Sequence, residues 1–180
     1  MGMEQNAAIN REEELGELIS VYGEKLMRYA VSILRSHQDA EDIVQDVFIS
    51  YFQNSHRFAV KNVSAWLYKM TYNHCLNELK KAKRRRLLFF GDLKEEPAAY
   101  MEDTLSMPEI MKALERLKPQ EIALLYGRAV EEQSYEELSQ IMGCSAAGLR
   151  KQYERVKKKA VKYLTAYGYS AESLCNLNYS

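Results

Sequence analysis

The sequence predicts an all-α protein made of two small helical domains joined by a flexible linker. Apolar residues recur at helical spacing along most of the 180 residues. Helix-breaking residues are scarce, because the chain has only three prolines and eight glycines. Periodicity fails in one interior stretch, residues 87–107, where glycine, proline, acids and small residues dominate. That stretch divides the helical pattern into two parts.

The first part is expected to contain three helices. Asn10 and Glu13 resemble a capping box that opens the first helix. The second helix should span about residues 36–53, and a polar loop follows it. The third should span about residues 62–86, ending in a basic run. The residues of this third helix expected to face inward are Val63, Trp66, Leu67, Met70 and Leu79.

The second part begins with a helical pattern over residues 109–117. Pro119 then suits the first turn of a helix over residues 120–130, where its missing N–H is no loss. Ser134 and Glu137 form a second candidate capping box, which opens a short helix.

A turn and one long helix complete this part. Gly143 should end the short helix, and Ser145 can cap a long helix that reaches Tyr163. The expected organisation is domain one over 11–86, linker over 87–107, domain two over 108–165 and a C-terminal tail over 166–180.

Charge is balanced overall but segregated along the chain. There are 25 basic and 25 acidic residues, so net charge indicates no particular partner. Residues 80–86 are almost wholly basic, and residues 150–162 hold seven bases against one acid. Such runs suit anionic ligands, although any one of them can simply be a solvated helix face.

Several protein classes are disfavoured by the sequence. The three cysteines and three histidines show no metal-ligand spacing. No nucleophile elbow, phosphate loop or metal triad is present, so we expect neither an enzyme nor a cofactor. No apolar run approaches membrane-spanning length and the N-terminus is acidic and polar, so we expect a cytoplasmic protein without a membrane partner.

The segment 39–48 predicts a helix with a binding face. One apolar stripe can dock the helix in a core. This docking stripe consists of Ala40, Ile43, Val44, Val47 and Tyr51. Asp39, Asp42 and Asp46 form a second, acidic face, and Phe48 and Ile49 carry large apolar groups beyond the docking stripe. Carboxylates mixed with aromatics suit a protein partner with a basic rim. A plain amphipathic helix with a wide core face is the alternative.

The third helix combines aromatic residues with bases. Aromatic platforms beside cations suit unpaired nucleic-acid bases, which stack on them with little sequence preference. We interpret Trp66 as a core residue in preference to a stacking residue, which leaves Tyr68, Lys69 and Tyr72 as the expected exposed set. Asn73 adds a donor and an acceptor suited to base edges.

Residues 134–163 have the pattern of a DNA-binding helix-turn-helix. Leu149, Tyr153 and Val156 can hold the second helix in the domain. Arginine on the opposite side can pair with guanine, and glutamate can accept from cytosine. The lysines farther along, at 157–159 and 162, suit phosphates. The alternative is an α-hairpin with a solvated basic face.

Taken in order, three segments resemble the bacterial sigma-70 family of transcription initiation factors, in its extracytoplasmic-function group. They are residues 39–48, residues 65–73 with the basic run that follows, and residues 134–150. The resemblance implies two domains, called region 2 and region 4, joined by a linker that threads through RNA polymerase. It implies a non-catalytic subunit that binds core polymerase, directs it to promoters and assists promoter melting.

The resemblance also implies the roles of particular residues. The residues expected to contact the largest polymerase subunits are Asp39, Glu41, Asp42, Gln45, Asp46 and Phe48. Those expected at the −10 element are Phe58, Lys61, Ser64, Trp66, Lys69 and Asn73. Those expected at the −35 element are Ser145, Arg150, Lys151, Glu154, Arg155 and Lys158.

The chain departs from the family pattern at two turns. Glu131-Glu132-Gln133 replaces the commoner Glu-Gly-hydrophobic turn before Ser134. Ala147-Gly148 stands where a Gly-Thr pair is usual, which removes a hydroxyl that could touch phosphate.

The expected partners are core RNA polymerase, promoter DNA and an anti-sigma factor, with the free protein a monomer. One alternative is a free-standing helix-turn-helix regulator, which would be a stable dimer on a palindromic site. A second alternative is a helical enzyme acting on nucleic acid, which the absence of catalytic clusters disfavours.

Overall fold

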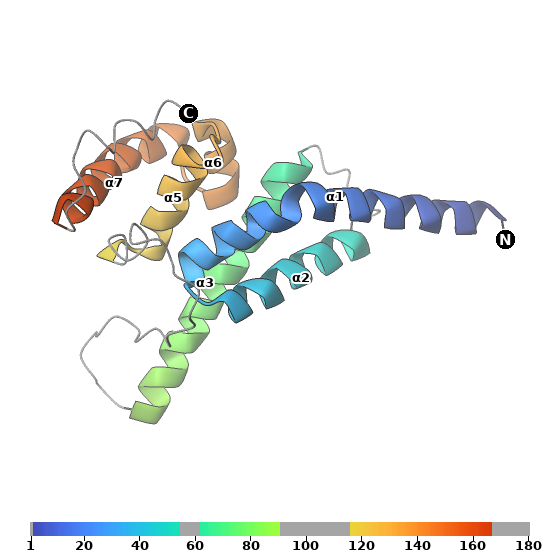
Figure 1. Cartoon of the computed structure of the whole chain (residues 1–180), viewed down its shortest axis with the longest axis horizontal. Coiled ribbons are helices and arrows are strands. Elements are labelled where there is room, and N and C mark those ends of the chain that lie inside the picture. The colour runs from blue at the N-terminus through green and yellow to red at the C-terminus, as the bar shows by residue number, and fades with distance from the viewer. Residues whose placement is uncertain (1, 55–61, 91–115, 167–180) are drawn as a thin grey trace.

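The computed structural model describes residues 2–54, 62–90 and 116–166, and every long element within them is a helix (Figure 1). The prediction of an all-α fold is confirmed. The helices, in chain order, are α1 (Gly2–Leu34), α2 (His37–Asn54), α3 (Val63–Phe90), α5 (Pro119–Ala129), α6 (Tyr135–Met142) and α7 (Ala146–Ala166). Helix α3 continues four residues past its expected end at about 86, so residues 87–90 of the expected linker are helical. The rest of that linker lies outside the described residues, as does the expected helix over 109–117 apart from its last two positions.

Side-chain caps fix where several helices begin. Ser36 Oγ accepts a hydrogen bond from the Asp39 amide, and Asn62 Oδ1 accepts one from the Ala65 amide. The first predicted start is wrong, because α1 begins at Gly2 and passes through Asn10. The sequence ahead of Asn10 contains glutamate, glutamine and two alanines, which are good helix formers.

The start of α6 and the turn between α6 and α7 have the capping residues that the sequence predicts. Ser134 Oγ accepts from the Glu137 amide at 3.1 Å, and the Glu137 carboxylate accepts from the Ser134 amide at 2.8 Å, so this capping box is confirmed. Gly143 ends α6 with φ +69°, a left-handed conformation that glycine adopts without strain. Ser145 Oγ accepts from the Gly148 amide and caps α7.

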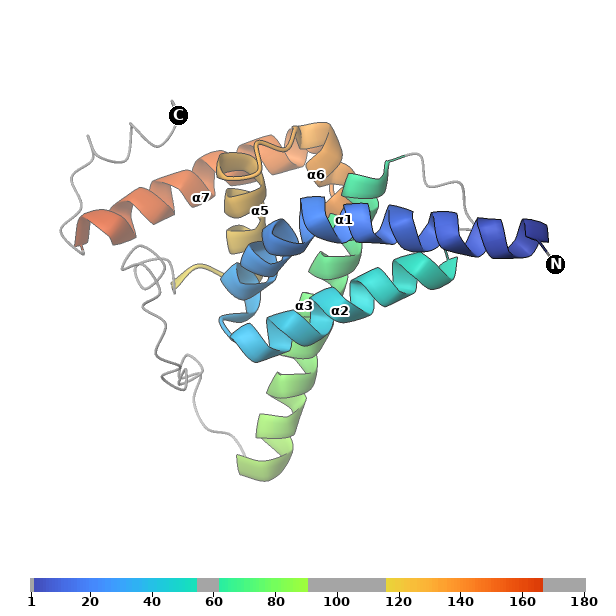
Figure 2. The same cartoon turned by 45° about the vertical axis from the view of Figure 1, so that its right-hand side comes forward.

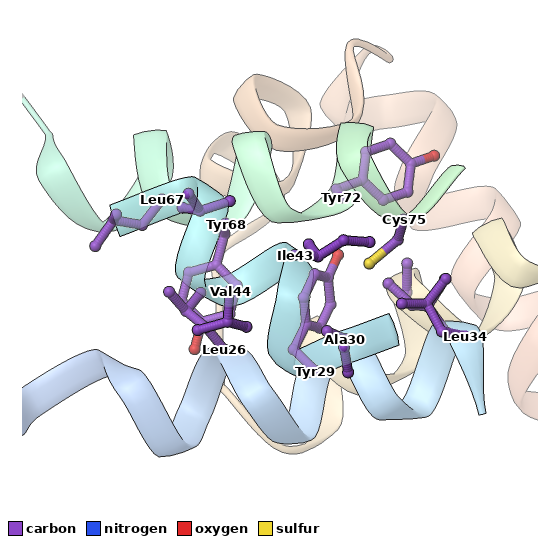
Figure 3. Close-up of a cluster of buried hydrophobic side chains, with 14 of the residues drawn as sticks. Leu26, Tyr29, Ala30, Leu34, Ile43, Val44, Leu67, Tyr68, Tyr72 and Cys75 are labelled. Carbon is purple, nitrogen blue, oxygen red and sulfur yellow. The ribbon is translucent and has the colours of Figure 1, made fainter. Parts of the chain in front are cut away.

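The first core lies where α1, α2 and α3 meet (Figure 3). Leu26, Tyr29 and Leu67 are fully buried there, and the Tyr29 ring meets the Tyr68 ring edge-on at 5.3 Å. The predicted docking stripe of α2 is buried as expected. Phe48 is buried too, because it lies one turn from Val44 on the same stripe.

The second core belongs to α5, α6 and α7. Leu124, Leu138 and Leu149 form one buried cluster with Tyr153, while Leu117 and neighbouring residues form another. Gly127 of α5 lies against Gln133, in the turn before α6, and against Leu138 of α6. A Cβ at Gly127 would sit 2.7 Å from Gln133 Oε1 and 2.8 Å from a Leu138 methyl, so only glycine fits.

The two halves of the molecule are in contact. In both views α5 lies beside α1 and α6 lies beside α3 (Figures 1 and 2). Ala123 of α5 and Ile141 of α6 are buried in the same apolar cluster as the α1–α3 core. The Tyr29 and Tyr126 rings lie 5.8 Å apart across this contact. Among the helices of the described ranges, none is long and apolar enough to cross a membrane.

Candidate functional site

The acidic face of α2 is exposed. Asp39, Asp42 and Asp46 point to solvent, and within the described part of the chain none of these carboxylates has a hydrogen-bonding or ion-pair partner. Glu41 and Gln45 are also exposed and form a hydrogen bond 3.5 Å long. Unpaired carboxylates in solvent are free to meet a basic partner.

Phe48 does not belong to this face. Its side chain is only 6% exposed and packs in the first core, so the expectation that it would be a surface contact is wrong. Ile49 is 53% exposed and is the large apolar residue that α2 presents beside the acids. The helical spacing of apolar residues could have predicted that Phe48 is buried, since it is four residues from Val44 and three from Tyr51.

The exposed polar strip of α3 consists of Lys69, Asn73 and Asn77, one helical turn apart. Ser64 lies half-buried at the start of the helix, while Phe58 and Lys61 lie outside the described residues. Trp66 is partly buried against the first core and meets Tyr51 edge-on at 5.6 Å, as its interpretation as a core residue predicted.

Tyr68 and Tyr72 correct the prediction of an exposed aromatic set. They are 2% and 6% exposed. The Tyr68 hydroxyl donates a hydrogen bond to Glu131 at 2.6 Å. Burial raises the pKa of Tyr72, and the nearby Cys144 thiol in the turn after α6 raises it further. Both tyrosines therefore belong to the first core, and groups from the second half of the chain lie close to them.

The exposed strip of α3 continues into the basic run. An open pocket of about 390 Å³ lies between α2 and α3, lined by Asp46, His74, Asn77, Glu78, Lys80, Lys81 and Arg84. Glu78 binds Lys81 at 3.2 Å and Arg85 at 2.8 Å on the same helix. The acidic face of α2 thus borders a basic surface on α3, and a partner seated on one would meet the other.

The helix-turn-helix presents its second helix, α7, as predicted. Leu149, Tyr153 and Val156 are buried and hold α7 against the domain. The predicted DNA contacts of this domain are all exposed, namely Ser145, Arg150, Lys151, Glu154, Arg155 and Lys158. An exposed basic helix that follows a tight turn can enter a DNA groove.

Tyr135 is a residue that sequence reasoning missed. The Arg150 guanidinium lies over its ring at 5.1 Å, and that of Arg128 at 5.4 Å. A cation resting on an aromatic face loses some of its freedom, so Tyr135 positions Arg150 at the start of α7. No short-range pattern links the two residues, because α6 and the turn separate them.

Lys159 is engaged within the protein. Its ammonium binds the Glu121 carboxylate of α5 at 2.5 Å. Partial burial acts to raise the pKa of Glu121, but the bond from Lys159 and the Lys118 amide outweigh it and lower that pKa. Lys159 was expected to suit phosphates, and the ion pair instead ties α7 to α5.

Comparisons with known proteins match this arrangement. The family model described as Sigma-70 region 2 matches residues 18–85, and that described as Sigma-70, region 4 matches residues 108–159. The chain is 23% identical over 158 residues to "ECF RNA polymerase sigma factor SigE" of Mycolicibacterium smegmatis, covering 84% of this chain and 62% of the relative's length. It is 20% identical to "RNA polymerase sigma factor YlaC" of Bacillus subtilis, covering 85% of this chain and 93% of that one.

Solved structures share the fold. A co-crystal structure of the sigma factor RpoE with the anti-sigma factor NepR from Bartonella quintana gives a TM-score of 0.72 at 22% identity. That match covers 85% of this chain and 98% of the other. CnrH in complex with the cytosolic domain of CnrY gives a TM-score of 0.66 at 20% identity, covering 90% and 94%.

Proposed function

Because this chain belongs to the sigma-70 family of transcription initiation factors, in its extracytoplasmic-function group, we propose that it binds core RNA polymerase and directs it to specific promoters. It would do so by recognising −10 and −35 elements and by assisting promoter melting. One observation carries the proposal: the region 2 and region 4 matches fall, in this order, on the two halves that carry an exposed acidic helix and an exposed basic helix-turn-helix.

The polymerase contact is assigned to the acidic face of α2. Asp39, Glu41, Asp42, Gln45 and Asp46 are exposed, and Ile49 replaces Phe48 as the apolar centre of the contact. An apolar centre with a charged rim is the usual composition of a protein interface. The charges would speed and orient association, and Ile49 would supply apolar burial.

The DNA contacts are divided between two helices. The exposed strip of α3, with Ser64 and Trp66 near its start, would handle the −10 element together with Phe58 and Lys61. The first turns of α7 would read the −35 element, with Arg150 and Glu154 at base edges and Lys158 at phosphate. Phosphate contacts would supply most of the affinity, and the base contacts would select the site.

The remaining expectations follow from the same family membership. Region 2 would occupy residues 11–86 and region 4 residues 108–165, with 87–107 as the linker and 166–180 as a tail. We assign the protein no catalytic role and no cofactor. We place its action in the cytoplasm. We also propose an anti-sigma factor as an additional partner, because one solved structure with this fold is a sigma factor in complex with the anti-sigma factor NepR.

Transcription from a randomised promoter library tests the proposal. Core polymerase with the purified chain should enrich promoters that share two separated sequence blocks, whereas core enzyme alone should enrich none. Asp46→Lys should abolish the enrichment, and Glu136→Lys on α6 serves as a matched charge reversal away from α2. If polymerase initiates no better with the chain than without it, the proposal is wrong. A stable dimer that selects palindromes without polymerase would point to a free-standing regulator instead.

A further inference from the structure

Arg150 and Glu154 lie one helical turn apart on α7, and both are assigned to base edges of the −35 element. Opposite charges at this spacing commonly form an ion pair on a helix surface. Such a pair would occupy the N–H groups and the carboxylate oxygens that base recognition uses. Both side chains are exposed, and neither forms an ion pair or a hydrogen bond with any residue of the described ranges.

The ring of Tyr135 holds Arg150 instead. The central carbon of the Arg150 guanidinium lies 5.1 Å from the centroid of this ring. A cation over an aromatic face is held by electrostatic attraction, without any hydrogen bond. The guanidinium therefore keeps all its N–H donors available, whereas a carboxylate partner would use some of them. Because Tyr135 belongs to α6, the contact ties Arg150 to the neighbouring helix and not to the next turn of α7.

The Tyr135 ring is itself fixed in the domain. The Ser134–Glu137 capping box defines the backbone at this point, because Tyr135 is the first residue of α6. The ring meets the Tyr153 ring edge-on at 6.3 Å. It also packs against a buried cluster of the second core, consisting of Leu124, Leu138, Leu149 and Tyr153. A guanidinium that rests on this ring is thus placed relative to the whole helix-turn-helix.

Arg128 uses the same ring differently. Its guanidinium lies 5.4 Å from the centroid of Tyr135 and also donates long hydrogen bonds to the carbonyl oxygens of Glu132 and Gln133, at 3.5 and 3.4 Å. Arg128 is half-buried, and the turn before α6 engages its donors. Arg150 is therefore the cation that this ring presents to solvent with its donors free.

We propose that Tyr135 is a positioning residue for −35 specificity, whose ring holds Arg150 away from Glu154 so that both side chains reach the DNA unpaired. Arg150 then offers its N–H donors, and Glu154 offers its carboxylate. The proposal rests on the proposed function, because only a chain that reads −35 bases has a use for two separate charges here. It assigns a part in base selection to a residue of α6 that need not touch a base.

Loss of the ring should affect two base positions at once. Without Tyr135, Arg150 is free to pair with Glu154, and each group would then be less available to DNA. The attraction of a guanidinium for an exposed ring corresponds to about a two- to five-fold change in an equilibrium. We therefore expect Tyr135→Leu to reduce discrimination by about this factor at the position read by Arg150 and at the position read by Glu154.

Competition binding measures this discrimination. Holoenzyme formed from core polymerase and the full-length chain is tested on single-base variants of a promoter selected from the library. Tyr135→Phe keeps the ring and should retain the wild-type discrimination, whereas Tyr135→Leu should lose it at both positions. An equal loss for all sequences in Tyr135→Leu would overturn the proposal, since Tyr135 would then be a general DNA contact. An equally large loss in Tyr135→Phe would also overturn it, because the hydroxyl and not the ring would then be required.

Two further variants separate positioning from folding. Adding Glu154→Ala to Tyr135→Leu removes the competing carboxylate, so discrimination at the Arg150 position should recover. No recovery would overturn the assignment of Glu154 as the competing partner. Tyr163→Leu is the matched control, because it removes a contact of 5.8 Å between Arg116 and an aromatic ring at the far end of α7. It should leave discrimination unchanged, and a loss equal to that in Tyr135→Leu would make the effect one of domain stability.

The contact can also be observed by NMR in the free chain, without DNA. Ring current should shift the Nε–H proton of Arg150 upfield in the wild type and in Tyr135→Phe, and Tyr135→Leu should lose this shift. Arg150→Lys identifies the signal by its absence. The same signal position in all three proteins would overturn the contact. If the shift is present but wild-type holoenzyme shows no base preference at the −35 element, the proposed function fails while the contact between Arg150 and Tyr135 stands.

Discussion

The Tyr68 hydroxyl donates a 2.6 Å hydrogen bond to Oε2 of Glu131, which joins positions 63 residues apart in the sequence. Glu131 lies in the turn that departs from the family pattern, and the next residue, Glu132, has φ +52°, where glycine is commoner. The Tyr29 hydroxyl is also buried, but it has no hydrogen-bond partner among the described residues. The two tyrosines are therefore both buried, but only the Tyr68 hydroxyl has a hydrogen-bond partner among the described residues.

Removing the hydroxyl should affect stability differently at Tyr68 and at Tyr29. Tyr68→Phe should destabilise the protein by about 1–3 kcal/mol, because it breaks a hydrogen bond to a charged acceptor. Tyr29→Phe should be neutral or stabilising, because it removes a buried polar group that lacks a partner. Urea unfolding followed by circular dichroism measures both. Equal losses in the two variants would contradict the distinction.

The contact between the halves should weaken at alkaline pH. Burial, followed by the hydrogen bond to Glu131, raises the pKa of Tyr68 well above its ordinary value near 10. A pKa that is higher in the folded state gives stability that is fully present below about pH 10 and is lost as pH rises toward the folded pKa. Unfolding measured from pH 8 upward should therefore show a shallower decline in Tyr68→Phe than in the wild type. Parallel curves would contradict this.

A methyl group at Gly127 should destabilise the second half. The added Cβ would meet Gln133 Oε1 at 2.7 Å and Leu138 Cδ2 at 2.8 Å. We expect Gly127→Ala to cost about 1–3 kcal/mol, which outweighs the helix-propensity gain of about 1 kcal/mol. Gly16→Ala on α1 is the control, because nothing lies within 4 Å of its added Cβ, and it should stabilise. Thermal unfolding compares the two variants.

Two basic residues of α7 should affect DNA binding differently. Arg150→Ala should relax preference at one base position of the −35 element, with a loss of about 1–3 kcal/mol there. Lys158→Ala should weaken binding to all sequences equally and reduce its salt dependence. Competition binding of holoenzyme to single-base variants of a selected promoter measures this. A uniform loss for Arg150→Ala would make Arg150 a phosphate contact.

Neighbouring residues of α2 should separate polymerase binding from folding. Asp46→Lys and Ile49→Ala should reduce retention by core polymerase while leaving the melting temperature unchanged, because both side chains are exposed. Phe48→Ala should instead cost about 3–5 kcal/mol of stability, because it leaves a cavity in the first core. Pulldown and thermal unfolding are measured on the same preparations. If core polymerase retains the Asp46→Lys variant fully, α2 is not the docking surface.

Local features of the fold could be predicted from the sequence, since local chemistry determines them. The Ser134 capping box, the left-handed Gly143 and the docking stripe of α2 each depend on residues within a few positions of one another. The start of α1 could not be placed, because good helix formers continue past the candidate cap at Asn10. Caps mark a helix start only where the chain ahead of them is not itself helical.

The site was predictable where exposure follows from periodicity alone. The basic residues of α7 and the acids of α2 were expected to be exposed, and they are. The burial of Tyr68 and Tyr72 was not predictable, because a tyrosine can lie in a core or at a surface. Part of their surroundings, Glu131 near Tyr68 and Cys144 near Tyr72, also comes from the other half of the chain. The same holds for Tyr135 and Arg150, which meet only after α6 and α7 have packed.

The unbroken length of α3 has a geometric consequence. Its 28 residues form a single rod about 42 Å long, with the residues assigned to the −10 element near one end and the basic run at the other. One residue inserted after Asn77 would swing every later side chain by about 100° around the rod. The basic run would then face another direction without any change in its composition. The direction in which each side chain of α3 faces around the helix axis therefore matters as much as the identity of its amino acids.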